Sequence, residues 1–593
     1  MRRVRLSALL IGLIAILALV AAGCGGSDDE GGSGSGGDTG GSAPAEGKQG
    51  GDLTFLAAAD VDYLDTGQSY YTFGYQVLYA TNRPLYSFAP GDDAPQPDLA
   101  DGDPQISDDK KEITVKIKTG IKYAPPVDRE VKSEDVKYAI ERAFSANVPS
   151  GYATSYFGDI VGAPAEPSKG VKEISGVETP DPQTIVLKLK RPVAESVAQA
   201  LVMPITVPVP KEYAEKYDAK APSEYDQYVT FTGPYMVKND PKTGKVTGRD
   251  PGKRIEMVRN PNWDKETDFR PAYLDSITIE EGNDDLTVAS RRTLSATSPT
   301  MCCDSGQPPI PVLSRAISQN KEQIGRVSGG GTRWIALNTT KKPFDNINMR
   351  KAVIAGFDRD ALRKTRGGDF IGPIAQGFIP PGIPGFEESG GEEAYKDIDY
   401  MANPKGDPAV MKKYLDAAKQ EGVTPSDGGD LLTIATNADP GNQTAQVAQA
   451  QLNKMGFKLN YRKVPQDTLY TKFCGVPKSN YVICPNVGWF KDFIDPQSLL
   501  EPTFKGAAIK PQGNVNWSLL DNKEIDDAMT KASLAPAGDE RSQAWADINK
   551  MIVEQAVAIP YVWDDNITLW SKDVDGAMNA YFSGPDFSFT TLK

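Results

Sequence analysis

The chain has 593 residues, with 65 Lys and Arg against 79 Asp and Glu, and a formal net charge of −14. This acidic balance argues against nucleic acid as a partner, because phosphate groups require a basic surface. Histidine is absent, which excludes the Ser-His-Asp and Cys-His triads and the His-ligated zinc sites.

The sequence also lacks the phosphate-binding loop G-x-x-x-x-G-K-[ST], the zinc motif H-E-x-x-H and the nucleophile motif G-x-S-x-G. We therefore expect no enzyme, no catalytic residue, no cofactor and no metal site. Paired carboxylates for glycoside hydrolysis remain open, since the sequence does not report their separation.

Residues 1–23 resemble a bacterial lipoprotein signal peptide. Three arginines precede an apolar run of about 16 residues, and small residues lead into Cys24. The resemblance implies cleavage before Cys24 and acylation of its side chain, so that the protein is extracytoplasmic and anchored to the bilayer through Cys24. Loss of the three arginines takes the net charge to about −17. An uncleaved signal anchor is the alternative, although a membrane span takes about 20 residues.

Residues 24–51 are predicted to be a flexible tether. After Cys24 they are almost wholly Gly, Ser, Asp, Glu, Ala and Thr, with no aromatic residue to form a core. A random coil of this length has an end-to-end distance of about 25 to 30 Å. No later apolar run reaches the length of a membrane span.

Strand and helix patterns alternate through the body of the chain. Strands are predicted at 53–57, 113–118, 184–189 and 276–280 from apolar residues or from apolar and polar alternation. Ser133 is predicted to cap a helix whose buried face begins at Val136. This alternation indicates an α/β protein of two or three domains.

Four cysteines follow Cys24, and an exported location favours their oxidation. A hairpin disulfide is predicted between Cys474 and Cys484, because Pro477 and Asn480 lie between them and a strand-like run leads into Cys484. The adjacent pair 302–303 forms a vicinal disulfide or stays reduced. A four-thiolate zinc site is the alternative, but C-x-x-C spacing is missing.

A series of short motifs resembles family 5 extracellular solute-binding proteins, the oligopeptide- and dipeptide-binding components of ATP-driven importers. The motifs keep the family's order from about residue 50 to about residue 565. They include Gly51-Asp52-Leu53-Thr54, Arg83-Pro84-Leu85-Tyr86, Lys118-Thr119-Gly120, Thr232-Gly233-Pro234-Tyr235, Arg259-Asn260-Pro261-Asn262-Trp263, Leu337-Asn338-Thr339-Thr340, Phe357-Asp358-Arg359 and the run from Gly488 to Pro496.

The resemblance implies a two-lobed, type II periplasmic-binding-protein-like fold with an additional third domain and a hinged cleft between the lobes. The first lobe is then discontinuous, over residues 52–88, 206–332 and 555–593. The additional domain covers 89–205, and the second lobe covers 333–554. The glycines at 329–331 suit a hinge crossing, or an ordinary exposed turn.

The same resemblance implies the ligand-binding residues. In peptide-binding relatives an aspartate after a Gly-Trp pair holds the ligand's α-ammonium, and Asp492 matches that position. Trp489 is similar to the aromatic residue lining this pocket, and Gly488 would let the ligand backbone approach. The remaining positions expected at the cleft are Arg333, Trp334, Tyr70, Tyr71 and Phe73. For the aromatic residues the alternative is core packing, and for Asp492 it is a surface or capping carboxylate.

The implied function is capture of a peptide and its delivery to the membrane permease and ATPase subunits of an importer. The protein is expected to be monomeric. Oligosaccharides or another small solute are the alternative ligand class, because an aromatic cluster also stacks on sugar rings. An extracytoplasmic hydrolase or a structural surface protein is the remaining alternative.

Overall fold

The computed structural model describes residues 47–92, 94–304 and 307–593. The predicted signal peptide, Cys24 and all but the end of the predicted tether lie outside these ranges. Within them, no helix is both long and apolar enough to cross a bilayer.

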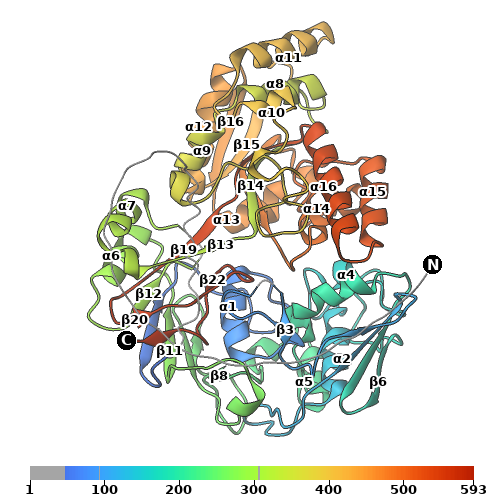
Figure 1. Ribbon diagram of the computed structural model, residues 1–593, viewed down its shortest axis with the longest axis vertical. Coiled ribbons are helices and arrows are strands. Elements are labelled where there is room, and N and C mark those ends of the chain that lie inside the picture. Colours follow the sequence, from blue (N-terminus) through green and yellow to red (C-terminus); the bar gives the residue numbers. More distant parts are fainter. Residues whose placement is uncertain (1–46, 93, 305–306) are drawn as a thin grey trace, which may run out of the picture. The chain divides into compact units, whose positions relative to one another are not determined.

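An eight-stranded mixed sheet combines strands from the beginning, middle and end of the chain (Figure 1). Its strand order is β13-β19-β12-β1-β11-β10-β8, with β9 paired to β10. The strands are β1 (Asp52–Leu56), β8 (Tyr235–Val237), β9 (Arg249–Asp250), β10 (Arg254–Arg259), β11 (Ser276–Glu280), β12 (Thr300–Cys302), β13 (Ile324–Ser328) and β19 (Asp565–Trp570).

In the two central strands β1 and β11, alternate side chains are apolar and point into the core. β1 and β11 run parallel, with Leu53 opposite Ile277 and Phe55 opposite Ile279. All four side chains are at most 1% exposed. The strands predicted at 53–57 and 276–280 are confirmed, because alternate residues on one face of a strand enter the same core.

A five-stranded sheet is built from the second half of the chain, in the order β16-β15-β17-β14-β18. Its strands are β14 (Gly331–Leu337), β15 (Asp430–Thr436), β16 (Lys458–Val464), β17 (Ile483–Phe490) and β18 (Ala558–Val562). β15 is parallel to β16 and β17, whereas β14 is antiparallel to β17 and β18. Helix α12 (Gly441–Lys454) packs on this sheet.

A four-stranded antiparallel sheet lies in the region predicted as the additional domain. It comprises β4 (Gln105–Ile106), β5 (Glu112–Lys116), β7 (Thr184–Lys188) and β6 (Val177–Asp181), in that spatial order. The strands predicted at 113–118 and 184–189 are confirmed. Helix α2 (Ser133–Ala143) packs against β6 and β7.

The predicted helix cap at Ser133 is wrong by one residue. Ser133 is already helical, and Lys132 has the extended conformation of the cap position. The Ser133 hydroxyl donates to the Asp181 carbonyl oxygen at 2.6 Å, while Asp135 accepts the Lys132 backbone N–H at 2.9 Å. Asp135 therefore supplies the local cap, while the Ser133 hydroxyl binds the end of β6.

The chain crosses between the eight-stranded and five-stranded sheets twice. It passes from β13 to β14 through Gly329 and Gly330, and returns from β18 to β19 through Trp563 and Asp564. A Cβ atom on Gly331 would lie 2.4 Å from the Phe490 ring, so glycine permits close packing there. β18 belongs to the five-stranded sheet, although the predicted division places residues from 555 onward in the first lobe. The domain boundaries remain a prediction.

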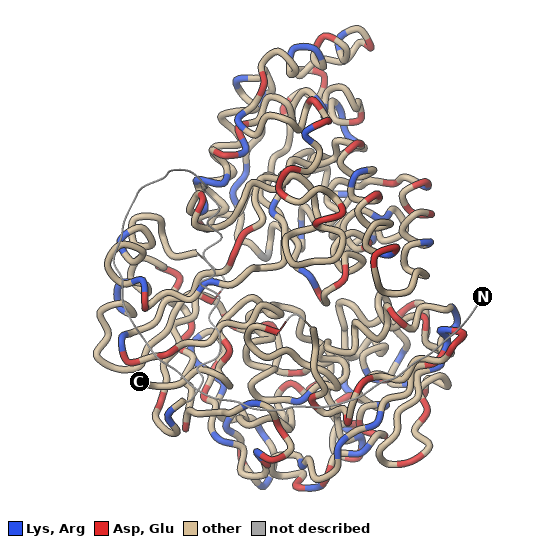
Figure 2. Tube along the Cα trace, in the orientation of Figure 1, with Lys and Arg blue, Asp and Glu red and all other residues tan. Residues whose placement is uncertain are grey.

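The other helices surround these sheets. They are α1 (Thr72–Thr81), α3 (Ala153–Tyr156), α4 (Ala194–Gln199), α5 (Lys211–Asp218), α6 (Leu286–Leu294), α7 (Ile310–Gln319), α8 (Ile347–Gly356), α9 (Arg359–Lys364), α10 (Asp399–Ala402), α11 (Pro408–Gln420), α13 (Gln466–Thr468), α14 (Gln497–Phe504), α15 (Lys523–Ser533) and α16 (Asp539–Glu554). The predicted α/β class is confirmed. Figure 2 shows acidic and basic residues interspersed along the described chain, without a long segment of basic residues alone.

Candidate ligand-binding site

Asp492 lies two residues beyond the end of β17 and is only 8% exposed. Its carboxylate accepts hydrogen bonds from the hydroxyls of Tyr70, at 3.0 Å, and Tyr156. Burial raises the pKa of Asp492 to about 7, although the two tyrosine hydrogen bonds act in the opposite direction. No Lys or Arg in the described ranges forms an ion pair with it. The site therefore presents a buried carboxylate without a cationic partner.

The loop before α1 positions the two adjacent tyrosines. Asp62 accepts the backbone N–H groups of Tyr70 at 2.5 Å and of Tyr71 at 3.1 Å. It also accepts the Ser69 hydroxyl at 2.8 Å. This turn directs the Tyr70 hydroxyl to Asp492, while the Tyr71 side chain is 60% exposed.

Aromatic rings continue from Tyr70 towards the five-stranded sheet. The Trp489 ring lies 6.2 Å from the Tyr70 ring and 6.2 Å from the Trp517 ring, both edge to face. The Trp489 indole N–H donates to the Ser498 carbonyl oxygen at 2.9 Å, which fixes the ring. Trp489 and Tyr70 therefore form one wall beside Asp492.

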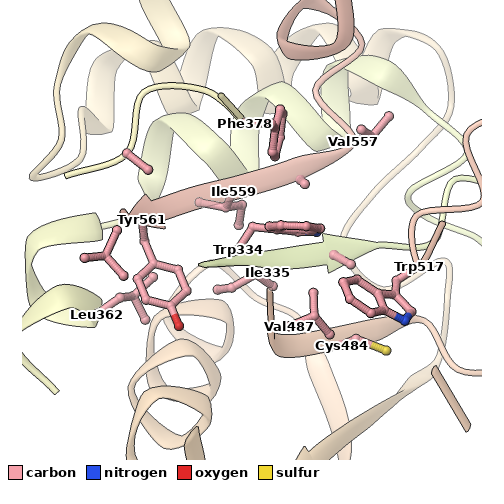
Figure 3. Close-up of a cluster of buried hydrophobic side chains, with 14 of the residues drawn as sticks. Trp334, Ile335, Leu362, Phe378, Cys484, Val487, Trp517, Val557, Ile559 and Tyr561 are labelled. Atoms are coloured by element: carbon pink, nitrogen blue, oxygen red, sulfur yellow. The ribbon is translucent and has the colours of Figure 1, made fainter. Parts of the chain in front are cut away.

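Two of the predicted aromatic residues lie in cores rather than on this wall. Trp334 is 2% exposed and packs against Phe378, Phe504 and Trp517 in the core of the five-stranded sheet (Figure 3). Phe73 is 4% exposed and stacks on Phe55, with 6.0 Å between the ring centroids. Their placement matches the core-packing alternative, because both rings are enclosed by other side chains.

Arg333 lies on β14, opposite Gly488 of β17. Its guanidinium packs over the Phe490 ring at 4.7 Å and donates from Nε to Asp564 at 3.1 Å. A Cβ atom on Gly488 would lie 2.5 Å from Cδ of Arg333. The space over Gly488 is therefore filled by the Arg333 side chain.

Asp564 also accepts hydrogen bonds from a second arginine, Arg366. Nη2 of Arg366 donates to the same carboxylate at 2.7 Å, and Asp564 is 2% exposed. The two arginines lower the pKa of Asp564, against the effect of burial, which is the largest influence and raises it. Asp564 is therefore ionised, and its carboxylate pairs with both Arg333 and Arg366.

The described residues include four cysteines. A disulfide joins Cys474 and Cys484, with their Cα atoms 6.3 Å apart. Cys474 ends a helical turn over Leu469–Cys474 and Cys484 lies in β17, so the bridge connects a helix end to a strand instead of two hairpin strands. Cys302 and Cys303 are buried free thiols. No cluster of three or more potential metal ligands occurs among the described residues.

Sequence reasoning missed Tyr156, Arg366 and Asp564. Tyr156 lies in a Tyr- and Ala-containing helical stretch in the additional-domain region, and its separation from Asp492 in the chain gives no sign of contact. Asp564 had a weak signal, because an acidic pair follows directly after an apolar strand.

The sequence matches the family described as "Bacterial extracellular solute-binding proteins, family 5 Middle" over residues 94–511. The chain belongs to this family. Its members are extracytoplasmic transport receptors and not enzymes, as the sequence predicts.

Two relatives cover most of the chain. The di/tripeptide-binding protein 2 of Pseudomonas aeruginosa is 25% identical over 88% of this chain and 92% of its own. The glutathione-binding protein GsiB of Shigella boydii is 25% identical over 82% of this chain and 83% of its own.

A solved structure, that of clavulanic acid biosynthesis oligopeptide binding protein 2, superposes with a TM-score of 0.79. It is 24% identical and covers 92% of this chain and 96% of its own. This similarity confirms the type II binding-protein fold with three domains.

Proposed function

We propose that this protein is a receptor that captures peptides between its lobes and delivers them to the permease and ATPase subunits of an importer. The buried carboxylate of Asp492 carries the proposal. A carboxylate out of water is costly unless a cation or hydrogen-bond donors compensate it. Its protein partners supply two hydroxyl groups but no positive charge.

The α-ammonium of a peptide supplies the missing charge. It is common to peptides of any sequence, so one aspartate serves many ligands. Trp489 and Tyr70 offer apolar surface beside the charge. The relatives named for di- and tripeptides and for glutathione support the same ligand class.

Exchange of Asp492 for Asn tests this role. The amide keeps a hydrogen-bond acceptor for the tyrosines but removes the charge. Since breaking a buried ion pair costs about 3 to 5 kcal/mol, affinity for a free-amino peptide should fall by about two to three orders of magnitude. The same peptide with an acetylated amino group should bind the unmodified protein weakly and lose little more in the Asp492→Asn variant.

Calorimetry on these four combinations forms a double-mutant cycle. A coupling energy near zero, with the Asp492→Asn variant still folded, would show that the ligand's ammonium group does not bind to Asp492. Competition by oligosaccharides instead of peptides would then favour the sugar-binding alternative.

Anchoring through Cys24 is part of the proposal and rests on the lipoprotein-like signal. Acyl chains on Cys24 would supply the membrane attachment. Cys24→Ser should yield a folded protein that is released from membranes or retained uncleaved, as measured by fractionation and by the mass of the N-terminal peptide. Equal processing and equal membrane retention in both proteins would contradict a lipid anchor.

A further inference from the structure

Glu281 carries a buried carboxyl group directly after β11. The residue is 8% exposed, and neither of its carboxyl oxygens accepts a hydrogen bond from a described residue. Its backbone N–H donates to the Lys253 carbonyl oxygen at 2.8 Å, in the turn between β9 and β10. The Gly252 N–H of the same turn donates to the Asp60 carboxylate at 3.1 Å. Asp60 and Glu281 therefore meet at this turn, beyond the carboxyl ends of the parallel strands β1 and β11.

The charges around Glu281 do not balance. Arg249 of β9 donates to Asp60 at 3.3 Å and to Asp226 at 3.0 Å. One guanidinium group thus serves a cluster of three carboxyl groups, those of Asp60, Asp226 and Glu281. The other cations on the adjoining elements form ion pairs elsewhere: Lys253 with Asp250, Arg254 with Glu256, and Arg292 with Glu280. Because a buried carboxylate without a compensating partner is costly, Glu281 requires a proton or a cation.

A proton satisfies this geometry without any further ligand. Burial, together with the neighbouring Asp60 carboxylate, raises the pKa of Glu281 to about 8, against the opposing effect of Arg249. A protonated carboxyl group donates one hydrogen bond to a neighbouring carboxylate, whereas Ca²⁺ takes at least about six oxygen ligands. The described part of the chain holds no group of three or more potential metal ligands. The observations therefore favour a proton over a cation.

The same cluster holds the start of the loop that carries Tyr70. Arg249 donates to the Val61 carbonyl oxygen at 3.1 Å, and Asp226 accepts the Leu64 backbone N–H at 2.6 Å. The Tyr70 hydroxyl then reaches Asp492 from the end of this loop. A change in the charge of the cluster therefore acts on the loop at its start.

We infer that Glu281 is a protonated carboxylic acid that donates to Asp60, and that this pair positions the loop carrying Tyr70. When Glu281 ionises, it releases one proton to the solvent and leaves two adjacent carboxylates, which repel each other. The loop then opens more often. Glu281 is thus a positioning residue that makes the loop sensitive to alkaline pH, whatever the class of the ligand.

Two substitutions separate the shared hydrogen bond from simple packing. The amide of Glu281→Gln donates to Asp60 at every pH, whereas Glu281→Ala provides no donor. Glu141→Gln is the matched control, because Glu141 is also buried, at 7% exposure, and burial also raises its pKa. Its carboxylate accepts the Ile174 N–H instead, at 3.0 Å. Thermal unfolding at about pH 6 checks that each variant folds.

The measurement is amide hydrogen exchange in residues 60–71 without ligand, read by mass spectrometry at about pH 6 and about pH 9. Proteins are compared at equal pH, so the intrinsic pH dependence of exchange and the titration of Asp492 cancel. All but Glu281→Ala should exchange alike at the lower pH. At the higher pH, the unmodified protein and Glu141→Gln should exchange up to about tenfold faster than Glu281→Gln, because ionised Glu281 then exceeds protonated Glu281 by about tenfold. Glu281→Ala should exchange fast at both pH values.

Three results would overturn the inference. The first is equal exchange of the unmodified protein and Glu281→Gln at the higher pH. The second is slow exchange in Glu281→Ala at the lower pH. The third concerns calcium chloride, added at about pH 6. If it raises the midpoint of thermal unfolding of the unmodified protein but not that of Glu281→Gln, a divalent cation neutralises the pair in place of the proton.

Discussion

At the scale of single residues, Asp492 is defined by its surroundings. Tyr70 comes from the loop before α1 and Tyr156 from α3, and both hydroxyls donate to the carboxylate that follows β17. A third hydroxyl, that of Tyr581, donates to the Asp492 backbone carbonyl at 3.0 Å. Residues from three distant parts of the chain thus enclose one ionisable group in a protein without histidine.

This enclosure predicts a pH dependence of stability. Because burial raises the pKa of Asp492 to about 7, the carboxyl group of Asp492 binds its proton more tightly in the folded protein than in the unfolded chain. The free energy of unfolding should therefore fall as pH rises from about 4 to about 7, by up to about 4 kcal/mol.

The Asp492→Asn variant should lack this part of the pH dependence, because an amide does not titrate. Denaturant unfolding of both proteins without ligand, at several pH values in this range, measures the difference. Asp586 and Asp565, whose pKa values burial raises to about 6, contribute equally to both proteins and cancel. Parallel curves for the two proteins would show that Asp492 titrates normally.

At the scale of elements, β17 connects the disulfide, the aromatic wall and the carboxylate. Cys484 is its second residue, Trp489 its last but one, and Asp492 follows its end. The bridge to Cys474 attaches the preceding helical segment to this strand. The loop that it closes is short, so the bridge restricts the unfolded chain only locally.

Loss of the bridge should destabilise the protein by about 2 to 3 kcal/mol, through the added freedom of the unfolded chain. Replacing both cysteines with Ala and comparing urea unfolding midpoints measures this cost. Peptide mapping without reduction should link Cys474 to Cys484 in the unmodified protein. Free thiols at both positions, or links from either to Cys302 or Cys303, would contradict the pairing.

The sequence predicted elements best where a local pattern coincides with a buried face. Alternation at 276–280 matches β11 because both neighbouring strands bury the same side of it. The prediction that Ser133 caps the helix was wrong, because the Ser133 hydroxyl donates its hydrogen bond to the Asp181 carbonyl oxygen. Within the site, the family resemblance gave the segment around Asp492. The resemblance did not show that Trp334 enters a core whereas its neighbour Arg333 does not. Successive side chains of β14 point to opposite faces of the sheet, and the resemblance does not say which face each one occupies.

At the scale of the whole molecule, the two sheet-containing lobes are connected by paired crossovers. Gly329 is close to the returning strand, since a Cβ atom there would lie 2.5 Å from the Asp564 carbonyl oxygen. The Ser583 hydroxyl donates to the Gly329 carbonyl oxygen at 2.8 Å. The ion-pair cluster of Arg333, Arg366 and Asp564 is adjacent to these crossovers, because Asp564 belongs to one of them.

A ligand bound to both lobes should favour the closed arrangement, since it contacts both sides only in that state. The radius of gyration from small-angle scattering should therefore decrease when a saturating peptide is added. Asp492→Asn, at a peptide concentration too low to occupy it, is the control and should show no change. An unchanged radius in the unmodified protein at saturation would argue against hinge closure.

The first described residues lie beside the last ones. Lys48 forms an isolated β-bridge with Leu592, and its backbone N–H donates to the Thr591 hydroxyl at 2.8 Å. The point at which the predicted tether joins the folded body is thus adjacent to the C-terminal strand β23 (Thr591–Leu592). In the protein with the proposed lipid anchor on Cys24, a fluorophore fused after Lys593 would therefore report the height of this junction above the bilayer by energy transfer to a membrane dye.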